Sequence, residues 1–397
     1  GTNEKPIFNL QTKSFLQDQM IDVGSGAFPV LCDIDGDGLP DLFIGNYGYY
    51  DSSEFKHGIL KCFYSSSIAY YKNIGSKNNP IFELVTDDFC NLRQHNYLSL
   101  SPTFADINND GKIDMMVGTS DGDILFFENN SQGNTVSFKA PVKNYQQIDI
   151  GEYATPQLFD INNNGLFDLI IGNRKGNLMY YKNTGTAEQA VFTLETNNFG
   201  NIDVRDYDES YFGYACPHFF RNENGETRLF VGAENGYIYY YKNIDNNLNG
   251  SFTLQDSMFF VQNNNRYPIQ EGIRTAPCCY PLTNDTLPDL FIGNYAGGIA
   301  HYKGITPPSI HIGISEQKHS IHTNDIRLYP NPIQTTFTLE SAEEIIEKIE
   351  IIDILGKSIY TKNIHNVVST HDISHLKNGV YIIKIQLNNK QITIKKL

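Results

Sequence analysis

The sequence predicts an all-β protein: a β-propeller of four-stranded blades, five of them recognisable, followed by a small immunoglobulin-like β-sandwich. Short aromatic and β-branched runs alternate with turns rich in Gly, Asn and Asp, which is a composition typical of strands and turns. One segment recurs five times before residue 304, and its apolar residues alternate with a period of two, which excludes a helical solenoid. After residue 304 the repeat stops and Ile and Lys become frequent.

Each repeat opens on two predicted strands that flank an acidic or amide-rich turn. The five copies span residues 29–46, 102–119, 156–173, 217–233 and 277–294. In the first four copies a turn glycine precedes a strand-end glycine by seven residues: Gly38 and Gly45, Gly111 and Gly118, Gly165 and Gly172, Gly225 and Gly232. In the fifth copy Thr286 replaces the turn glycine before Gly293. The constant spacing fixes how the repeats align.

A third strand follows in every repeat, and a fourth in the first four repeats. The third strand reads like YYKN, at 67–73, 122–129, 176–183, 236–243 and 297–304. The fourth is a short F-x-L segment, at 80–84, 136–138, 191–194 and 251–254. Four short strands per unit, separated by turn residues, are typical of a propeller blade.

The first and last repeats differ from the others. The first carries 17 additional residues between Gly45 and Asn73, a Tyr-rich loop that is either a contact surface or a tolerated excursion. The last repeat lacks an F-x-L strand, and residues 6–10 (PIFNL) offer a spare one. Docking that strand into the last blade would close a five-bladed ring and remove two exposed edges. The alternative is a larger ring with further blades upstream of residue 1.

Composition excludes several classes of protein. The net charge is -15, from 30 Lys and Arg against 45 Asp and Glu, which argues against nucleic-acid binding. Residues 1–320 carry -16 of this charge and residues 321–397 carry +1. No apolar stretch is long enough for a transmembrane segment. The six Cys show no metal-binding spacing, so buried thiols are expected, with a disulfide or two as the alternative.

The acidic turn of the first repeat predicts a metal site. Residues 33–41 read D-x-D-x-D-G-x-x-D. Alternate carboxylates on a tightly turning loop point toward one centre, a glycine at position six permits the turn, and the carbonyl at position seven adds an oxygen. Four carboxylates so close together repel one another unless a hard cation lies among them. Many flexible oxygens favour calcium over magnesium.

With these loops and this repeat, residues 6–304 resemble the FG-GAP or VCBS repeat family, whose blades build the propeller of integrin α-subunits and carry calcium in such loops. The resemblance implies two to three calcium sites. The implied ligands are Asp33, Asp35, Asp37, the Leu39 carbonyl and Asp41 in the first loop; Asp106, Asn108, Asp110, the Lys112 carbonyl and Asp114 in the second; and Asp160, Asn162, Asn164, the Leu166 carbonyl and Asp168 in the third. The third loop has only two carboxylates and should bind more weakly. Asp and Asn turns without any metal are the alternative.

The last two repeats are expected to lack calcium. The fourth has Phe220, Asn222, Asn224 and Arg228 at the ligand positions, and the fifth has Pro281, Thr283, Asp285 and Asp289. The sequence also lacks the usual motifs of hydrolases, zinc peptidases and nucleotide-binding enzymes, so no enzyme is expected. Tyrosines in strands should pack between blades, whereas residues 47–50 and 207–211 are candidate ligand surfaces.

The tail forms a separate predicted domain. Residues 305–325 look like a linker after a propeller of residues 1–304, and residues 326–397 offer alternating strands for the sandwich. Residues 326–397 resemble the type A sorting domain of the type IX secretion system of Bacteroidota. The motif residues are Leu328, Tyr329, Pro330, Asn331, Pro332, Gly356, Lys357, Gly379, Tyr381, Lys395 and Lys396. The resemblance implies export across the outer membrane and recognition by the translocon and its outer-membrane shuttle protein.

Together these observations predict a secreted, cell-surface, calcium-binding β-propeller for adhesion, with a glycan or protein ligand on the propeller face. The sequence is also compatible with two alternatives. One is a structural subunit docked to an outer-membrane secretion assembly. The other is a polysaccharide-acting enzyme built on the propeller.

Overall fold

The structure is a computed structural model that describes residues 21–303 and 326–396, apart from 134, 209, 258, 263–264, 283–287, 330–334, 342–344, 353–356, 375, 377–380 and 389–391. The chain divides into two compact units, Gly1–Pro308 and Ser309–Leu397. Every strand pair is antiparallel, and the few helical segments are short 3-10 turns, which confirms the all-β prediction. The predicted first strand (6–10) and the linker (305–325) lie outside the described residues.

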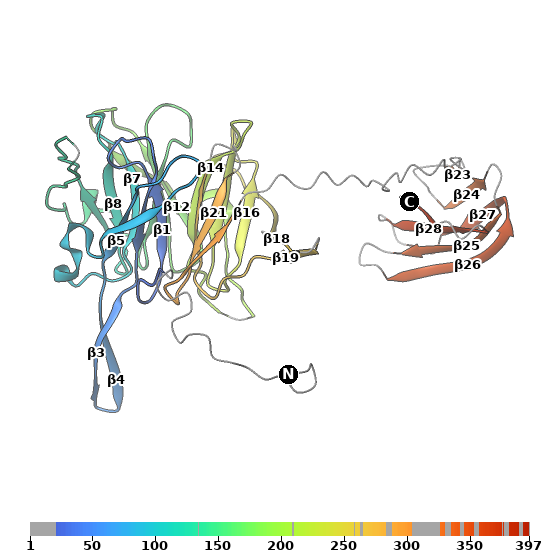
Figure 1. Cartoon of the computed structure of the whole chain (residues 1–397), viewed down its shortest axis with the longest axis horizontal. Coiled ribbons are helices and arrows are strands. Elements are labelled where there is room, and N and C mark those ends of the chain that lie inside the picture. The colour runs from blue at the N-terminus through green and yellow to red at the C-terminus, as the bar shows by residue number, and fades with distance from the viewer. Residues whose placement is uncertain are drawn as a thin grey trace. The chain divides into compact units, whose positions relative to one another are not determined.

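Among the described residues, five small sheets that follow the repeat, together with two hairpins, make up the first unit (Figure 1). The first contains β1 (Phe28–Cys32), β2 (Asp41–Gly45), β5 (Ile68–Asn73) and β6 (Phe82–Thr86). The second contains β7 (Ser101–Ala105), β8 (Asp114–Gly118) and β9 (Ile124–Phe127). The third contains β10 (Thr155–Phe159), β11 (Asp168–Gly172), β12 (Leu178–Asn183) and β13 (Phe192–Thr196). The fourth contains β14 (Cys216–Arg221), β15 (Thr227–Gly232), β16 (Ile238–Lys242) and β17 (Thr253–Ser257), and the fifth β20 (Ala276–Tyr280), β21 (Asp289–Gly293) and β22 (Ile299–Tyr302).

The second sheet lacks the predicted fourth strand at 136–138. This segment meets the third strand only through isolated bridges, Asn129 to Phe138 and Phe126 to Val142. Pro141 stands between the two bridges and has no N–H to donate to a ladder. The prediction of four strands therefore holds for the first, third and fourth sheets, whereas the second has three.

Buried apolar side chains lie between each sheet and the next. Separate clusters join the first and second, the second and third, the third and fourth, the fourth and fifth, and also the fifth and first sheets. The strand tyrosines take part as predicted: Tyr70 and Tyr180 are almost fully buried and stack on Phe43 and Phe199, with ring centroids 4.7 and 4.6 Å apart.

One backbone hydrogen bond recurs between all neighbouring sheets. The residue three positions before the first-strand proline donates its N–H to the carbonyl of the residue two positions after the strand-end glycine of the adjacent sheet. The five bonds run from Ser99 to Tyr47, Tyr153 to Ser120, Tyr214 to Arg174, Arg274 to Glu234 and Gly26 to Tyr295, with N···O distances of 2.9–3.2 Å. The fifth sheet is thus bonded to the first in the same way as the others are bonded to each other.

Two hairpins interrupt the repeat. The insertion in the first repeat, expected as a loop, forms β3 (Tyr49–Lys56) and β4 (Ile59–Ser65), which project from the other sheets of this unit in Figure 1. The sequence signal for this hairpin is the two-residue turn His57–Gly58 between strand-like runs. A second hairpin, β18 (Phe259–Gln262) and β19 (Asn265–Pro268), follows the fourth sheet.

The second unit is a sandwich of two sheets. One contains β23 (Ile326–Tyr329), β24 (Thr336–Ser341) and β27 (Val368–Asp372); the other contains β26 (Ser358–Asn366), β25 (Ile346–Ile352), β28 (Ile382–Leu387) and β29 (Ile392–Lys396). Fully buried Phe337, Ile351 and Ile385 belong to the core between the sheets. Leu328 and Tyr329 pair with β24, and Lys395 and Lys396 pair with β28. The motif residues Pro330, Asn331, Pro332, Gly356 and Gly379 lie outside the described residues.

Candidate metal centres and aromatic face

The first three acidic loops share one conformation. Each connects the first two strands of its sheet and occupies residues 33–41, 106–114 or 160–168. In each loop the side chain at position one accepts the N–H of position six, the side chain at position three accepts the N–H of position five, and that at position five accepts the N–H of position seven. The glycine at position six has a φ of 81–84° in all three loops, which favours a residue without Cβ.

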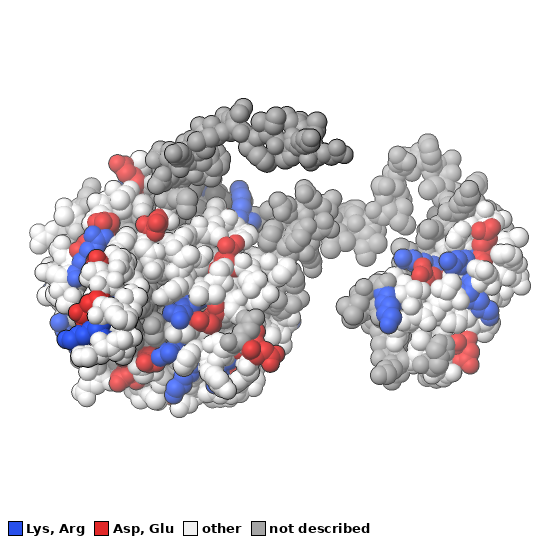
Figure 2. Space-filling view, turned by 90° about the horizontal axis from the view of Figure 1, so that it is seen from below, with Lys and Arg blue, Asp and Glu red and all other residues white. Residues whose placement is uncertain are grey.

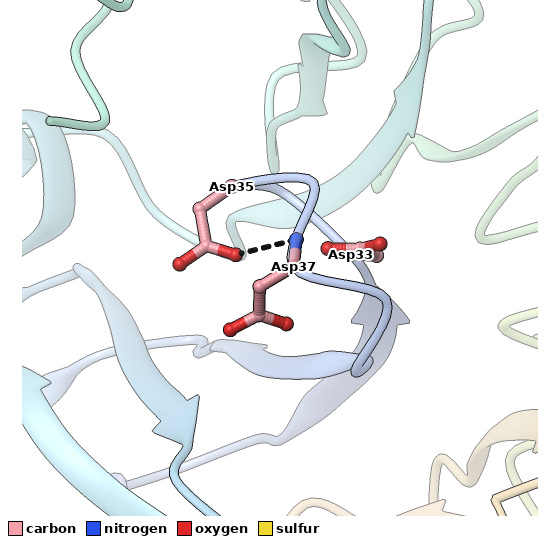
Figure 3. Close-up of side chains that lie close together, drawn as sticks. All are labelled: Asp33, Asp35 and Asp37. Carbon is pink, nitrogen blue, oxygen red and sulfur yellow. Dashed lines mark hydrogen bonds between the residues drawn. The ribbon is translucent and has the colours of Figure 1, made fainter. Parts of the chain in front are cut away.

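Three carboxylates converge in the first loop. Asp33, Asp35 and Asp37 each offer an oxygen, and these oxygens lie within 4.8 Å of one another (Figure 3). Asp33 Oδ2 accepts the N–H of Gly38 at 2.9 Å, whereas Asp33 Oδ1 is buried and has no hydrogen-bond partner among the described residues. A buried, unpartnered carboxylate oxygen beside two further carboxylates fits an oxygen-ligated cation.

The second and third loops keep the geometry with fewer charges. Positions one, three and five hold Asp106, Asn108 and Asp110 in the second loop and Asp160, Asn162 and Asn164 in the third. The number of carboxylates at these positions falls from three to two to one. Since amide oxygens are neutral ligands, the capacity to hold a divalent cation should fall in the same order.

The acid at position nine, which the sequence predicts as a calcium ligand, lies apart from the converging carboxylates of the first loop. Asp41, Asp114 and Asp168 are fully buried, and none of them belongs to the cluster of converging carboxylates among the described residues. Each accepts a hydrogen bond of 2.7–2.8 Å from the backbone N–H of an asparagine at the end of the third strand or just after it. The donors are Asn73, Asn129 and Asn183, respectively. The position-nine acid therefore ties the second strand to the third.

Burial raises the pKa of each position-nine acid. The pKa of Asp41, Asp114 and Asp168 rises from 3.8 to about 6 because burial disfavours the charged form, although hydrogen bonds from backbone N–H groups oppose the shift. At neutral pH these buried carboxylates are charged at a cost in stability. A cation in the adjacent loop would reduce that cost.

Lys72 is a neighbour of the first loop that sequence reasoning missed. It lies on β5, donates to Asp35 Oδ2, and places its Nζ 3.6 Å from Asp37 Oδ2. The residue at the same position is Glu128 in the second sheet, Lys182 in the third and Lys242 in the fourth. The Lys72 ammonium therefore partly neutralises the most acidic of the three loops.

The fourth and fifth loops differ from the first three. Arg228 stands opposite Phe220, where the first sheet has Asp41 opposite Cys32, and its guanidinium bonds Glu226 and the Thr227 carbonyl. In the fifth loop, Thr283 and Asp285 lie outside the described residues, whereas Asp289 is buried.

Aromatic and arginine side chains gather at the other end of the second strands, where β2 and its equivalents finish. The rings of Tyr47 and Tyr295 are 5.7 Å apart, and those of Tyr153 and Tyr214 are 4.9 Å apart. The guanidinium of Arg274 lies 3.8 Å from the ring centroid of Tyr214 and 4.6 Å from that of Tyr295. These side chains leave a cavity of only about 20 Å³ among them.

The backbone beneath this cluster is strained. Tyr153, Tyr214 and Arg274 occupy the position three residues before the first-strand proline, and all have a positive φ of 46–58°. Large side chains rarely adopt this conformation, and such strain costs about 1–3 kcal/mol where the surrounding structure imposes it. The sequence marked the position by its spacing but gave no sign of the conformation.

Exposed aromatic residues extend the cluster outward. Phe212 stacks on the guanidinium of Arg174 at 3.8 Å, and beside it Tyr211 is 82% exposed. Tyr64 belongs to β4, and its ring centroid lies 5.4 Å from that of Tyr47, so the cluster extends to the base of the hairpin β3–β4. We call Tyr47, Tyr64, Tyr153, Tyr214, Tyr295, Tyr211, Phe212, Arg174 and Arg274 the aromatic face. Figure 2 views the chain from the side toward which β3 and β4 project, and acidic and basic side chains intermingle there.

None of the six cysteines forms a disulfide. Cys32, Cys216, Cys278 and Cys279 are buried, as expected for thiols in a core, whereas Cys62 on β4 is exposed. Among the described residues, no helix has the length and apolar character needed to cross a membrane.

Comparisons with solved structures give only remote likenesses. PorZ, a surface component of the type-IX secretion system of Porphyromonas gingivalis, is 14% identical with a TM-score of 0.28; the match covers 91% of this chain and 50% of PorZ. BBS1N, from its complex with ARL6DN, is 14% identical with a TM-score of 0.30, covering 81% and 90%. The extracellular domain of a putative one-component system from B. thetaiotaomicron is 10% identical with a TM-score of 0.29, covering 95% and 58%.

The chain thus spans about half the length of PorZ. No curated protein matches the sequence.

Family models match two parts of the chain. The model of the FG-GAP-like repeat matches residues 33–117 and 106–171, which include all three loops with converging oxygen ligands. The model of the secretion system C-terminal sorting domain matches residues 327–397, which form the sandwich. A type IX sorting domain directs export to the cell surface. The protein is therefore an exported all-β chain that carries FG-GAP-like repeats and a type IX secretion system C-terminal sorting domain.

Proposed function

We propose that the protein is a calcium-binding adhesion protein of the cell surface, which holds a glycan or protein ligand on its aromatic face and catalyses no reaction. The observation that carries this proposal is the strained aromatic and arginine cluster at the end of the sheets opposite the acidic loops. Aromatic and Arg side chains are enriched where proteins bind partners, and backbone strain concentrates at binding sites.

Calcium would stiffen the ring that supports this face. Asp33, Asp35 and Asp37 would hold it in the first loop, and the unpartnered Asp33 Oδ1 supports this assignment. The second and third loops would hold it through the same hydrogen-bonded conformation with fewer charges. The bound ion would supply positive charge among carboxylates that otherwise repel one another.

Lys72→Met is expected to raise calcium affinity at the first loop about fivefold. Its ammonium competes with the ion for Asp35 and Asp37, and a partly exposed pair of this kind contributes up to about 1 kcal/mol. Lys242→Met, at the same position beside the fourth loop, is the matched control and should leave affinity unchanged. Isothermal titration with calcium measures both variants. Equal affinity in Lys72→Met and the parent chain would contradict the competition.

The sorting domain points to a second set of partners. Residues 327–397 match the sorting-domain model, and we propose that the type IX translocon and its outer-membrane shuttle protein recognise this sandwich. Residues 321–397 carry a net charge of +1, whereas residues 1–320 carry -16. The domain that the export machinery would recognise therefore differs in charge from the repeats.

Ligand binding is tested on a glycan array and against immobilised cell-surface proteins, each with calcium present. The wild-type chain should bind at least one member, and Tyr211→Ser combined with Phe212→Ser should weaken that binding at least about tenfold. Leu194→Thr removes a half-exposed apolar side chain from a sheet edge and serves as the control. If the double variant binds as tightly as wild type, the aromatic face is not the binding surface.

A further inference from the structure

The hairpin β3–β4 is a two-stranded sheet with two free edges. Its strands pair Phe55 with Leu60 and Glu54 with Lys61, and its turn residues His57 and Gly58 have φ values of 53° and 81°. These values are typical of the two-residue turn that suits a twisted hairpin. No other described strand pairs with either β3 or β4. The hairpin extends away from the five sheets in Figure 1.

Apolar side chains cover the end of this hairpin. Phe55 is 74% exposed, Ile59 69% and Leu60 61%. A lone hairpin is only marginally stable in water, and an open strand edge is a template for a further strand. Exposed backbone groups along an edge are satisfied best by another polypeptide in the extended conformation. These properties together indicate a surface for strand addition.

The ladder pattern limits how a strand can join β3. In a two-residue hairpin the pair next to the turn, Lys56 and Ile59, exchanges hydrogen bonds, and the pattern alternates from there. The N–H and C=O of Phe55 and Ser53 therefore point to the free edge. The register shifts between Tyr50 and Ser52, which ends the regular edge at the base of the hairpin.

The charges of Glu54 and Lys56 favour one antiparallel register between β3 and the same strand of a second copy. Centred on Phe55, the pairing puts Glu54 opposite Lys56 of the second copy, twice by symmetry. Centred on Glu54, it would put two carboxylates opposite each other, which is destabilising. The edge is therefore self-complementary in one register, although the whole chain carries -15 and repels a second copy elsewhere.

We propose that two copies of the protein associate through β3, antiparallel and centred on Phe55, to form a four-stranded sheet in the order β4-β3-β3-β4. Phe55 and Leu60 lie directly opposite each other, so the two copies would align four apolar side chains in one row across this sheet. On the other face each Glu54 would lie between Lys61 of its own hairpin and Lys56 of the second copy. This interface is independent of the ligand proposed for the aromatic face.

Sedimentation velocity of the full chain, from about 1 to about 200 µM, tests the association, since contacts of modest size reach micromolar affinity. Wild type is expected to form dimers, and Phe55→Thr should raise the dissociation constant at least about tenfold. Leu194→Thr, on the exposed edge of the third sheet, should leave it unchanged. A monomeric wild type, or a Phe55→Thr variant that dimerises as wild type does, would overturn the proposal.

Charge exchange identifies the register. Lys56→Glu puts like charges opposite each other, and so does Glu54→Lys combined with Lys61→Glu, which preserves the opposite-charge pair inside the hairpin. Each of these chains should be monomeric alone, and an equimolar mixture should form the mixed dimer. Circular dichroism verifies that each variant is folded. A mixture that stays monomeric, or a variant that dimerises alone, would refute pairing centred on Phe55.

Discussion

Removal of calcium is expected to lower the melting temperature of the Gly1–Pro308 unit by roughly 10 °C. A ligand that binds only the folded state at about 100 times its dissociation constant stabilises that state by about 2.7 kcal/mol per site. Two such sites would contribute about 5 kcal/mol, and in a domain of this size each kcal/mol shifts the melting temperature by about 2–4 °C. Calorimetry in millimolar calcium and in chelator measures the difference; identical melting curves would contradict calcium binding.

Asp37→Asn separates the charge of a ligand from its hydrogen bond. Asp37 Oδ1 accepts the N–H of Leu39 at 2.9 Å, and Asn164 already makes the equivalent bond to Leu166 in the third loop. The amide should therefore preserve the turn while weakening calcium binding. The variant is expected to melt close to wild type in chelator and several degrees lower in calcium. Asp208→Asn, an exposed acid far along the chain from the loops, is the control.

The same melting experiment at pH 5 tests the buried acids. The pKa of Asp41, Asp114 and Asp168 is raised to about 6 in the fold, above the value of the unfolded chain, so protonation favours the fold. Without calcium, stability is highest below about pH 4 for these groups and falls as pH rises through about 6. Calcium in the adjacent loop favours the charged form of these three acids, so its stabilising effect should be larger at pH 7.5 than at pH 5.

The acidic loops could be predicted because their structure is local. Each side chain at positions one, three and five bonds a backbone N–H no more than five residues away, so sequence spacing determines the contacts. The acid at position nine was expected to close the same site. Its shortest hydrogen bond comes from the N–H of a residue 15 to 32 positions away, such as Asn73 for Asp41. In the third loop Asp168 also accepts a hydrogen bond from the side-chain amide of Asn162 at position three. Spacing within the loop carries no information about that strand.

Long-range neighbours account for the other differences. Lys72 lies 37 residues after Asp35 in the sequence. The 17-residue insertion makes this separation longer than that between the equivalent positions of the other repeats. The strained Tyr153 and Arg274 adopt their backbone conformation because each bonds a carbonyl of the adjacent sheet. The hairpin β3–β4 has a local signal in the sequence, the His57–Gly58 turn. The insertion was nevertheless interpreted as a loop because of its length.

Gly293→Ala is expected to destabilise the first unit by about 3 kcal/mol, which corresponds to a fall of roughly 10 °C in melting temperature. A Cβ at Gly293 would lie 2.1 Å from the carbonyl oxygen of Ala27 and 2.8 Å from Pro29 Cδ, so the backbone of the first sheet would have to move. Gly298→Ala, five residues later, meets nothing within 4 Å and should melt within a degree or two of wild type. Calorimetry of both variants in calcium makes the comparison.

The glycine pair also tests the contact between the fifth and first sheets. The strand-end glycines of all five repeats approach a carbonyl of the adjacent sheet in the same way, and a Cβ at Gly45 would lie 1.9 Å from the Leu100 oxygen. Gly45→Ala should therefore be as destabilising as Gly293→Ala if the five sheets are equivalent. If Gly45→Ala lowers the melting temperature and Gly293→Ala does not, the fifth sheet does not pack against the first in solution. Because one glycine position recurs at every junction between sheets, the spacing that defines the repeat in the sequence is explained by the close approach of neighbouring backbones.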